Sequence, residues 1–263
     1  MTSVDYYVVR DQDASSLAVT AQETTQGPWV TGMQHGGPPN ALAVAAAERC
    51  VTEATGRTDL IAVRLASDFV GPVPVADLDV RTSVRRAART AALVDVTVSA
   101  HGRECLAARV WFVRDADTSA LAAPLPPAVE LPTDAPGVDA SFGYSESIEW
   151  RFVSGAMRRP GPAAAWARPR GELLRGHAWS GLSRAAVVAD SGNGLSAELD
   201  WDEWGFLNVD LDIHLARPLE GEWVLLDART TLGAHGSALA TSTLSDVHGV
   251  VGTGNQTLVL AHR

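Results

Sequence analysis

The sequence predicts an α+β protein built from two similar units, each an antiparallel sheet wrapped around one helix. The 263 residues divide at a proline-rich segment into two parts of about 120 residues each. Both parts show the same order of patterns: short strands, one helix of small residues, then strands of alternating polarity. A helix that is apolar on all sides has to be buried, and a curved sheet can bury it.

The proline-rich segment is the predicted boundary between the units. Residues 122–137 contain five prolines, which favour an extended connection over a helix or a strand. We therefore expect an N-terminal unit over 1–121, a linker over 122–140 and a C-terminal unit over 141–263.

Period-two alternation, typical of a strand with one buried face, marks the same place in each unit. Residues 63–72 and 209–218 alternate in this way and lie 146 positions apart. A His-Gly pair follows in each unit, at His101 and at His248, with almost the same offset. A period this long indicates a duplicated domain rather than a short structural repeat.

Each unit also has one segment typical of a buried helix. The first, 40–52, is rich in alanine, and Asn40 is expected to be its N-cap because two prolines precede it. The second, 180–190, is expected to stop at the serine and glycine run 191–194. Further strands are expected before the helices, over 5–10, 16–22, 147–153 and 163–168. This order of elements is that of the hot-dog fold, present twice.

Composition excludes several classes of function. The net charge is −10 and no basic stripe occurs, so we expect no nucleic-acid partner. No apolar run approaches the roughly 20 residues of a membrane span, and residues 1–10 do not resemble a secretory signal, so we expect a cytoplasmic protein without membrane contact. All 21 basic residues are arginine, which excludes Schiff-base chemistry at lysine.

Four short motifs resemble the acyl-CoA thioesterase II family. The His-Gly-Gly run at 35–37 is similar to the glycine pair that opens the family's first helix. Residues 186–190 resemble the family's second helix, which ends in a catalytic aspartate. Residues 206–210 resemble the next strand, and 254–257 resemble the last strand, which carries a catalytic glutamine. Together these motifs span nearly the whole chain in the family's order.

The resemblance implies a double hot-dog thioesterase that needs neither a metal nor another cofactor. In that family an aspartate, a threonine and a glutamine hold and activate a water molecule. Here Asp190 and Gln256 match, while the threonine position is Asn208, whose amide also hydrogen-bonds water. The residues expected to bind the acyl-CoA substrate are His35, Gly36, Gly37 and Asn40.

The first unit lacks a matching acid. Residues 41–47 of its helix contain no carboxylate, and Glu48 is the nearest one. Arg109 stands at the repeat position of Gln256. We therefore expect one active site, with the first unit forming part of the pocket wall.

Strand alternation makes the orientation of Asn208 an open question. It places Asn208 on one face with Asp210, Asp212 and His214, so Asn208 reaches a site on the other face only if a bulge intervenes. The side chains of Asp210, Asp212 and His214 are spaced roughly 6.5–7 Å apart along the strand, which is too far for a compact metal site. We expect a solvated polar face there.

The predicted function is hydrolysis of an acyl-CoA thioester to a carboxylic acid and free CoA. The alternative is an acyl-CoA or lipid-binding protein that has lost catalysis, which the asparagine at 208 favours. A hot-dog dehydratase is a third candidate. No G-x-S-x-G elbow occurs, which disfavours a serine hydrolase, and no Gly-Asp-x-Asn-Pro-x-His run occurs, which disfavours an enoyl-CoA hydratase. Self-association into a homo-oligomer stays open.

Overall fold

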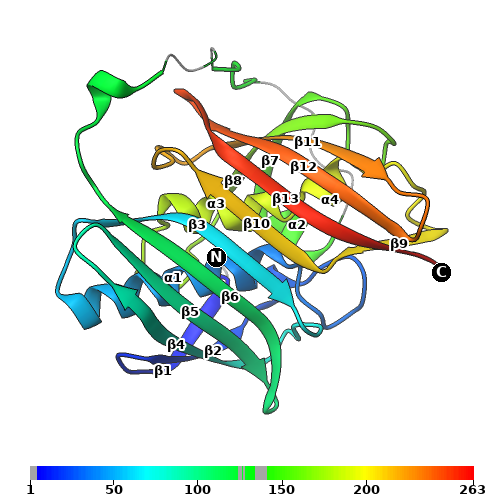
Figure 1. Ribbon diagram of the computed structural model, residues 1–263. Coiled ribbons are helices and arrows are strands. Elements are labelled where there is room, and N and C mark those ends of the chain that lie inside the picture. Colours follow the sequence, from blue (N-terminus) through cyan, green and yellow to red (C-terminus); the bar gives the residue numbers. More distant parts are fainter. Residues whose placement is uncertain (1–4, 124–125, 127, 134–140) are drawn as a thin grey trace.

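The computed structural model describes residues 5–123, 126, 128–133 and 141–263 (Figure 1). The first half contains, in order, β1 (Tyr7–Gln12), β2 (Ser16–Ala21), α1 (Gly37–Thr55), β3 (Leu60–Phe69), β4 (Asp77–Ala87), β5 (Ala91–Ala100) and β6 (Arg103–Arg114). The second contains α2 (Gly143–Ser147), β7 (Ile148–Ser154), β8 (Ala163–Pro169), α3 (Gly181–Ala189), α4 (Gly192–Leu195), β9 (Trp204–Asn208), β10 (Asp210–Leu215), β11 (Val224–Leu232), β12 (Ser237–Asp246) and β13 (Gly249–His262).

The strands form one 13-stranded sheet in the order β1-β2-β4-β5-β6-β3-β10-β13-β12-β11-β8-β7, with β9 paired to β13. The order in the first half is repeated in reverse in the second. The halves join where β3 and β10 run antiparallel, with Ser67 opposite Leu211. The predicted α+β fold with two tandem hot-dog units is therefore confirmed.

The two long helices pack against each other on the inner face of this sheet (Figure 1). Most of α1 is buried, including Leu42 and Val44. Gly37 of α1 contacts the backbone of Val187, late in α3. A small residue is needed there because a side chain would collide with the Val187 carbonyl oxygen.

The start of α1 corrects one expectation. Asn40 is not the N-cap: Gly36 occupies that position, and the helix already begins at Gly37. Pro38 and Pro39 fit in the first turn because backbone N–H groups there have no partner inside the helix. The Asn40 side chain instead donates to the Gly36 carbonyl at 3.0 Å.

The second helix starts and ends within a residue of the predicted positions. Ser180 is the N-cap of α3, and its hydroxyl accepts from the Ser183 N–H. The helix ends at Ala189 with Asp190 as C-cap. The serine and glycine run that follows was expected to stop the helix, and α3 does end just before it; the run then forms a separate short helix, α4, which was not predicted.

A bulge separates β9 from β10. Asn208 pairs with Leu258, and Asp212 pairs with Asn255, so the β9–β10 side has one residue more than β13 between these pairs. Val209 lies at the bend. A bulge of this kind turns a side chain to the other face of a sheet.

The proline-rich segment lies only partly within the described residues. Positions 124–125, 127 and 134–140 fall outside them, and the unit boundaries stay a prediction. Across the described ranges, no helix is long and apolar enough to span a membrane.

Candidate active site

A cleft of about 520 Å³ opens between the loop before α1 and the β9–β10 bend. Its walls are mostly apolar, from Val30, Met33, Phe69, Pro72, Leu207 and Val259. Asp190 lies in this cleft as its one acidic side chain and is only 3% exposed. A buried carboxylate needs hydrogen-bond partners, and these define the site.

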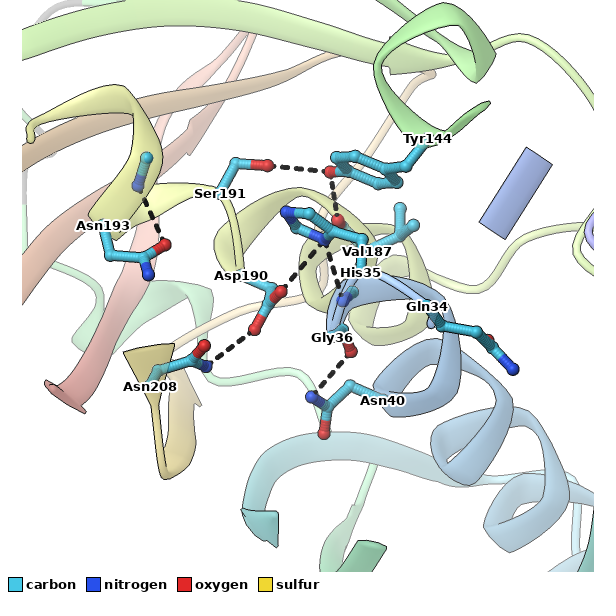
Figure 2. A network of polar contacts seen from close by, with 12 residues as sticks. Gln34, His35, Gly36, Asn40, Tyr144, Val187, Asp190, Ser191, Asn193 and Asn208 are labelled. Carbon is cyan, nitrogen blue, oxygen red and sulfur yellow. Dashed lines mark hydrogen bonds and ion pairs between the residues drawn. The ribbon is translucent and has the colours of Figure 1, made fainter. Parts of the chain in front are cut away.

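Both carboxylate oxygens of Asp190 have a side-chain partner (Figure 2). Oδ2 lies 3.0 Å from Nδ1 of His35, and Oδ1 accepts a hydrogen bond of 2.9 Å from Nδ2 of Asn208. The three residues come from the C-cap of α3, the loop before α1 and the end of β9. Segments far apart in the sequence therefore meet at one carboxyl group.

The contact between His35 and Asp190 requires a shared proton. Two bare acceptors do not approach to 3.0 Å, so the proton lies on His35 Nδ1 or on Asp190 Oδ2. The Gly37 N–H also lies 3.2 Å from Nδ1 and can donate to it when Nδ1 carries no proton. The pair can therefore exist in two states that differ in the position of one proton.

Glycine at position 36 allows this close approach. A Cβ added there would lie 2.5 Å from the Phe69 ring and 2.8 Å from both oxygens of Asp190. Gly36 lines the cleft directly beside the carboxylate. Asn40, fully buried behind it, holds the Gly36 carbonyl and does not line the cleft.

The bulge turns Asn208 toward the cleft. Its Nδ2 donates both to Asp190 and to the carbonyl of Asp210, at 2.9 Å and 3.1 Å. Strict alternation would turn Asn208 away from the cleft, and the bulge is what allows it to face the cleft. Asp210 itself faces Thr257, accepting from its hydroxyl at 3.0 Å, and among the described residues no group of three or more His, Cys, Asp or Glu side chains is placed to hold a metal.

Gln256 lies behind the carboxylate rather than beside it. It is 2% exposed and does not line the cleft. Its Nε2 donates to the backbone carbonyl of Asp190 at 3.0 Å, and its Oε1 accepts from the Asn193 N–H at 3.0 Å. The side chain therefore fixes the junction of α3 and α4.

Tyr144 of α2 is a site residue that the sequence analysis missed. Its ring stacks on His35, with centroids 3.7 Å apart and planes at 6°. Its hydroxyl donates to the Val187 carbonyl at 2.6 Å and lies 2.8 Å from the Ser191 hydroxyl (Figure 2). Burial raises the pKa of Tyr144 well above its usual value, so the hydroxyl stays protonated. No local pattern marks a tyrosine that contacts residues more than 40 positions away.

The doubled sheet around paired helices, with this cleft between its halves, defines a double hot-dog protein. Residues 25–113 match the family model described as the acyl-CoA thioesterase N-terminal domain, and residues 124–260 match the model of the C-terminal domain. The chain therefore belongs to the acyl-CoA thioesterase family of the thioesterase II type, as the sequence motifs predicted.

Solved structures of similar fold support the architecture. An acyl-CoA thioesterase II, TesB2, from Mycobacterium marinum is 13% identical with a TM-score of 0.72, covering 97% of this chain and 95% of that chain. A hot-dog protein from Alicyclobacillus acidocaldarius is 14% identical with a TM-score of 0.75, covering 95% of both. A tesB protein from Mycobacterium avium is 16% identical with a TM-score of 0.69, covering 96% of both. No curated protein matches this sequence.

Proposed function

We propose that this protein hydrolyses an acyl-CoA thioester to a carboxylic acid and free CoA by direct attack of water. One observation supports this most: a buried carboxylate, Asp190, lies in a mostly apolar cleft and is held at both oxygens by His35 and Asn208. Thioester hydrolysis needs a positioned base next to an apolar acyl site, and this arrangement supplies both.

In the proposed reaction Asp190 takes a proton from water as the water oxygen bonds to the thioester carbon. The carbonyl π bond opens and its electrons move to the carbonyl oxygen. When the tetrahedral intermediate collapses, the C–S bond breaks and the CoA thiolate takes the proton back from Asp190. The Oδ1 atom of Asn208 can accept the second hydrogen of the water, because its Nδ2 is already used as a donor.

The negative charge on the carbonyl oxygen needs N–H donors. We assign the backbone N–H group of Gly36, at the start of α1, where the helix dipole also favours negative charge. The Gly37 N–H faces Nδ1 of His35 instead, and Pro38 and Pro39 have no N–H to donate. The absence of a side chain at Gly36 lets the thioester lie against Asp190.

We assign Gln256 and Tyr144 as positioning residues. Gln256 holds the backbone at Asp190, and Tyr144 holds the plane of the His35 ring. His35 in turn orients Oδ2 of Asp190. The cytoplasmic location and any self-association stay predictions from the sequence.

Release of free thiol from acyl-CoAs of different chain length tests the proposal. We expect turnover with at least one acyl-CoA and none with the corresponding oxygen ester of the same acid, because an alkoxide is a much poorer leaving group than a thiolate. An acyl-CoA that binds without releasing thiol would instead support the non-catalytic binding protein, which the asparagine at 208 favours.

A further inference from the structure

A second cleft, of about 420 Å³, lies at the other end of the paired helices. Its apolar walls come from Leu17, Ala45, Leu173, Leu174 and Ala178. Glu48 and His177 are also part of its lining. None of the residues that line this cleft line the cleft of Asp190.

The duplication relates the two clefts. His177 follows His35 by 142 positions, and Asp190 follows Glu48 by the same number. In the first cleft a carboxylate at the end of α3 faces the start of α1. In the second, Glu48, late in α1, forms a hydrogen bond with Ser180 at the start of α3. The second cleft thus also has a histidine and a carboxylate, but here the histidine comes from the second half and the carboxylate from the first.

The amides of the first site have no counterpart in the second. With the strand offset of 146, Asn208 corresponds to Ala62, and Gln256 corresponds to Val110. Val110 is a fully buried apolar residue, and Arg109, which the sequence had matched to Gln256, is exposed and pairs with Asp95 at 3.3 Å. Without groups to hold a water, the second cleft is suited to binding rather than hydrolysis.

The two arginines near the second cleft are already bound to groups of the protein. Arg49 is occupied by the carbonyls of Asp13 and Ser16 and lies 3.5 Å from Glu53, so these charges offset each other. Arg184 of α3 bonds to two backbone carbonyls.

Glu48 bonds to Ser180, and Nδ1 of His177 lies 3.2 Å from the Arg175 carbonyl, so Nε2 of His177 and the second oxygen of Glu48 can meet a ligand. Burial raises the pKa of Glu48 to about 7, although its bond to Ser180 lowers it. Near neutral pH the carboxyl can therefore be protonated and act as a donor.

We infer that the second cleft binds a carboxylic acid with an apolar tail, its carboxylate against Glu48 and His177. The choice of an acyl ligand rests on the proposed function, since such an acid is the product of the hydrolysis. The ligand carboxylate accepts hydrogen bonds from the Glu48 carboxyl and the His177 ring. Its tail lies along Leu17, Leu173 and Leu174.

Calorimetric titration with decanoate at pH 6 and pH 8 tests this inference. Because Glu48 must be protonated, we expect one binding event to weaken about tenfold between these pH values. In Glu48→Gln the amide donates at every pH, so that event should lose most of its pH dependence. The matched control Glu53→Gln, one helical turn further along, should behave as wild type.

Ala178→Trp provides a second test, because a ring at this exposed rim position would cover the cleft and remove the event. Absence of decanoate binding, or pH dependence that persists in Glu48→Gln, would overturn the inference. Thiol release by Glu48→Gln separates the two proposals, since we expect wild-type turnover from this variant. A protein that binds decanoate through Glu48 but hydrolyses no acyl-CoA would retain the second site and lose the proposed function.

Discussion

At the scale of single residues, Asn208 holds the proposed base in place. Replacing it by leucine keeps the volume but leaves Oδ1 of Asp190 without its donor. A hydrogen bond to a charged group contributes about 1.5–3 kcal/mol, so we expect kcat/KM to fall about tenfold to hundredfold in Asn208→Leu. Asn208→Thr supplies a hydroxyl and should lose less. Equal activity of the leucine variant and wild type in a thiol-release assay would contradict this role.

Tyr144 contributes to stability through its hydroxyl and to the site through its ring. Tyr144→Phe removes the bonds to Val187 and Ser191, both of which are buried. We expect the free energy of unfolding to drop by about 1–3 kcal/mol, because the buried Val187 carbonyl loses its donor and the buried Ser191 hydroxyl loses its acceptor. The stacking on His35 remains, so kcat should change little. Urea unfolding and steady-state kinetics check both statements, and a large loss of kcat without loss of stability would contradict them.

Residue identities at the site were easier to predict than their contacts. The motifs indicated His35, Asp190 and Asn208, and the structure brings these three together. The catalytic roles of these residues remain proposals. Gln256 hydrogen-bonds the backbone carbonyl of Asp190 and does not line the cleft. Asn40 lies within the helix rather than at its N-cap. Such details depend on tertiary packing, which local patterns do not contain.

At the scale of elements, periodicity predicted the two long helices and several of the strands, but not the short helices α2 and α4. The helix start at Gly37 was missed because prolines were interpreted as preceding the helix, although the first turn accepts them. The bulge at Val209 depends on how β9 and β10 pair with β13, and strict alternation cannot show it. It is the feature that turns Asn208 into the cleft.

A buried ion pair connects two elements of the second half. Arg217, just after β10, donates to both oxygens of Asp246 at the end of β12, each at 2.6 Å. Burial raises the pKa of Asp246, but bonds from Arg217 and from the N–H groups of Glu220 and His248 outweigh it and lower the pKa below its usual value. A lowered pKa contributes stability above the unfolded value of about 3.9, which is lost as pH falls through the folded value.

This sign leads to a pH-dependent prediction. Asp246→Asn should unfold more easily than wild type at pH 7, and the difference should shrink as pH falls below about 4. Denaturant unfolding of both proteins from pH 7 to pH 3 measures it. A difference that is constant over this range would show that ionisation of Asp246 does not contribute to stability.

At the scale of the whole molecule, the two halves share their core. The sheet continues from β3 to β10, and α1 packs on α3. A fragment of residues 141–263 alone would expose the edge of β10 and the apolar face of α3. We expect this fragment not to fold cooperatively, and to fold when residues 1–121 are produced with it. Circular dichroism during thermal unfolding tests this, and a cooperative transition of the isolated fragment would contradict the shared core.

Sharing the core also explains why the cleft of Asp190 contains residues from both halves. His35 and Gly36 come from the first, while Asp190 and Asn208 come from the second. Duplication gives a second cleft at the opposite end, where only the histidine and a carboxylate recur. Divergence of the halves has therefore left one proposed site of hydrolysis and one proposed site of binding.

The rate of thiol release by Asp190→Asn tests the central claim most directly. Asparagine keeps the shape of the side chain but cannot take a proton from water. Loss of a general base should lower kcat about 10²- to 10⁴-fold, while Asp202→Asn, an exposed carboxylate in the same half, should match wild type. Near-UV circular dichroism should show that both variants keep the fold. Wild-type kcat in a folded Asp190→Asn protein would contradict the assignment of Asp190 as the base.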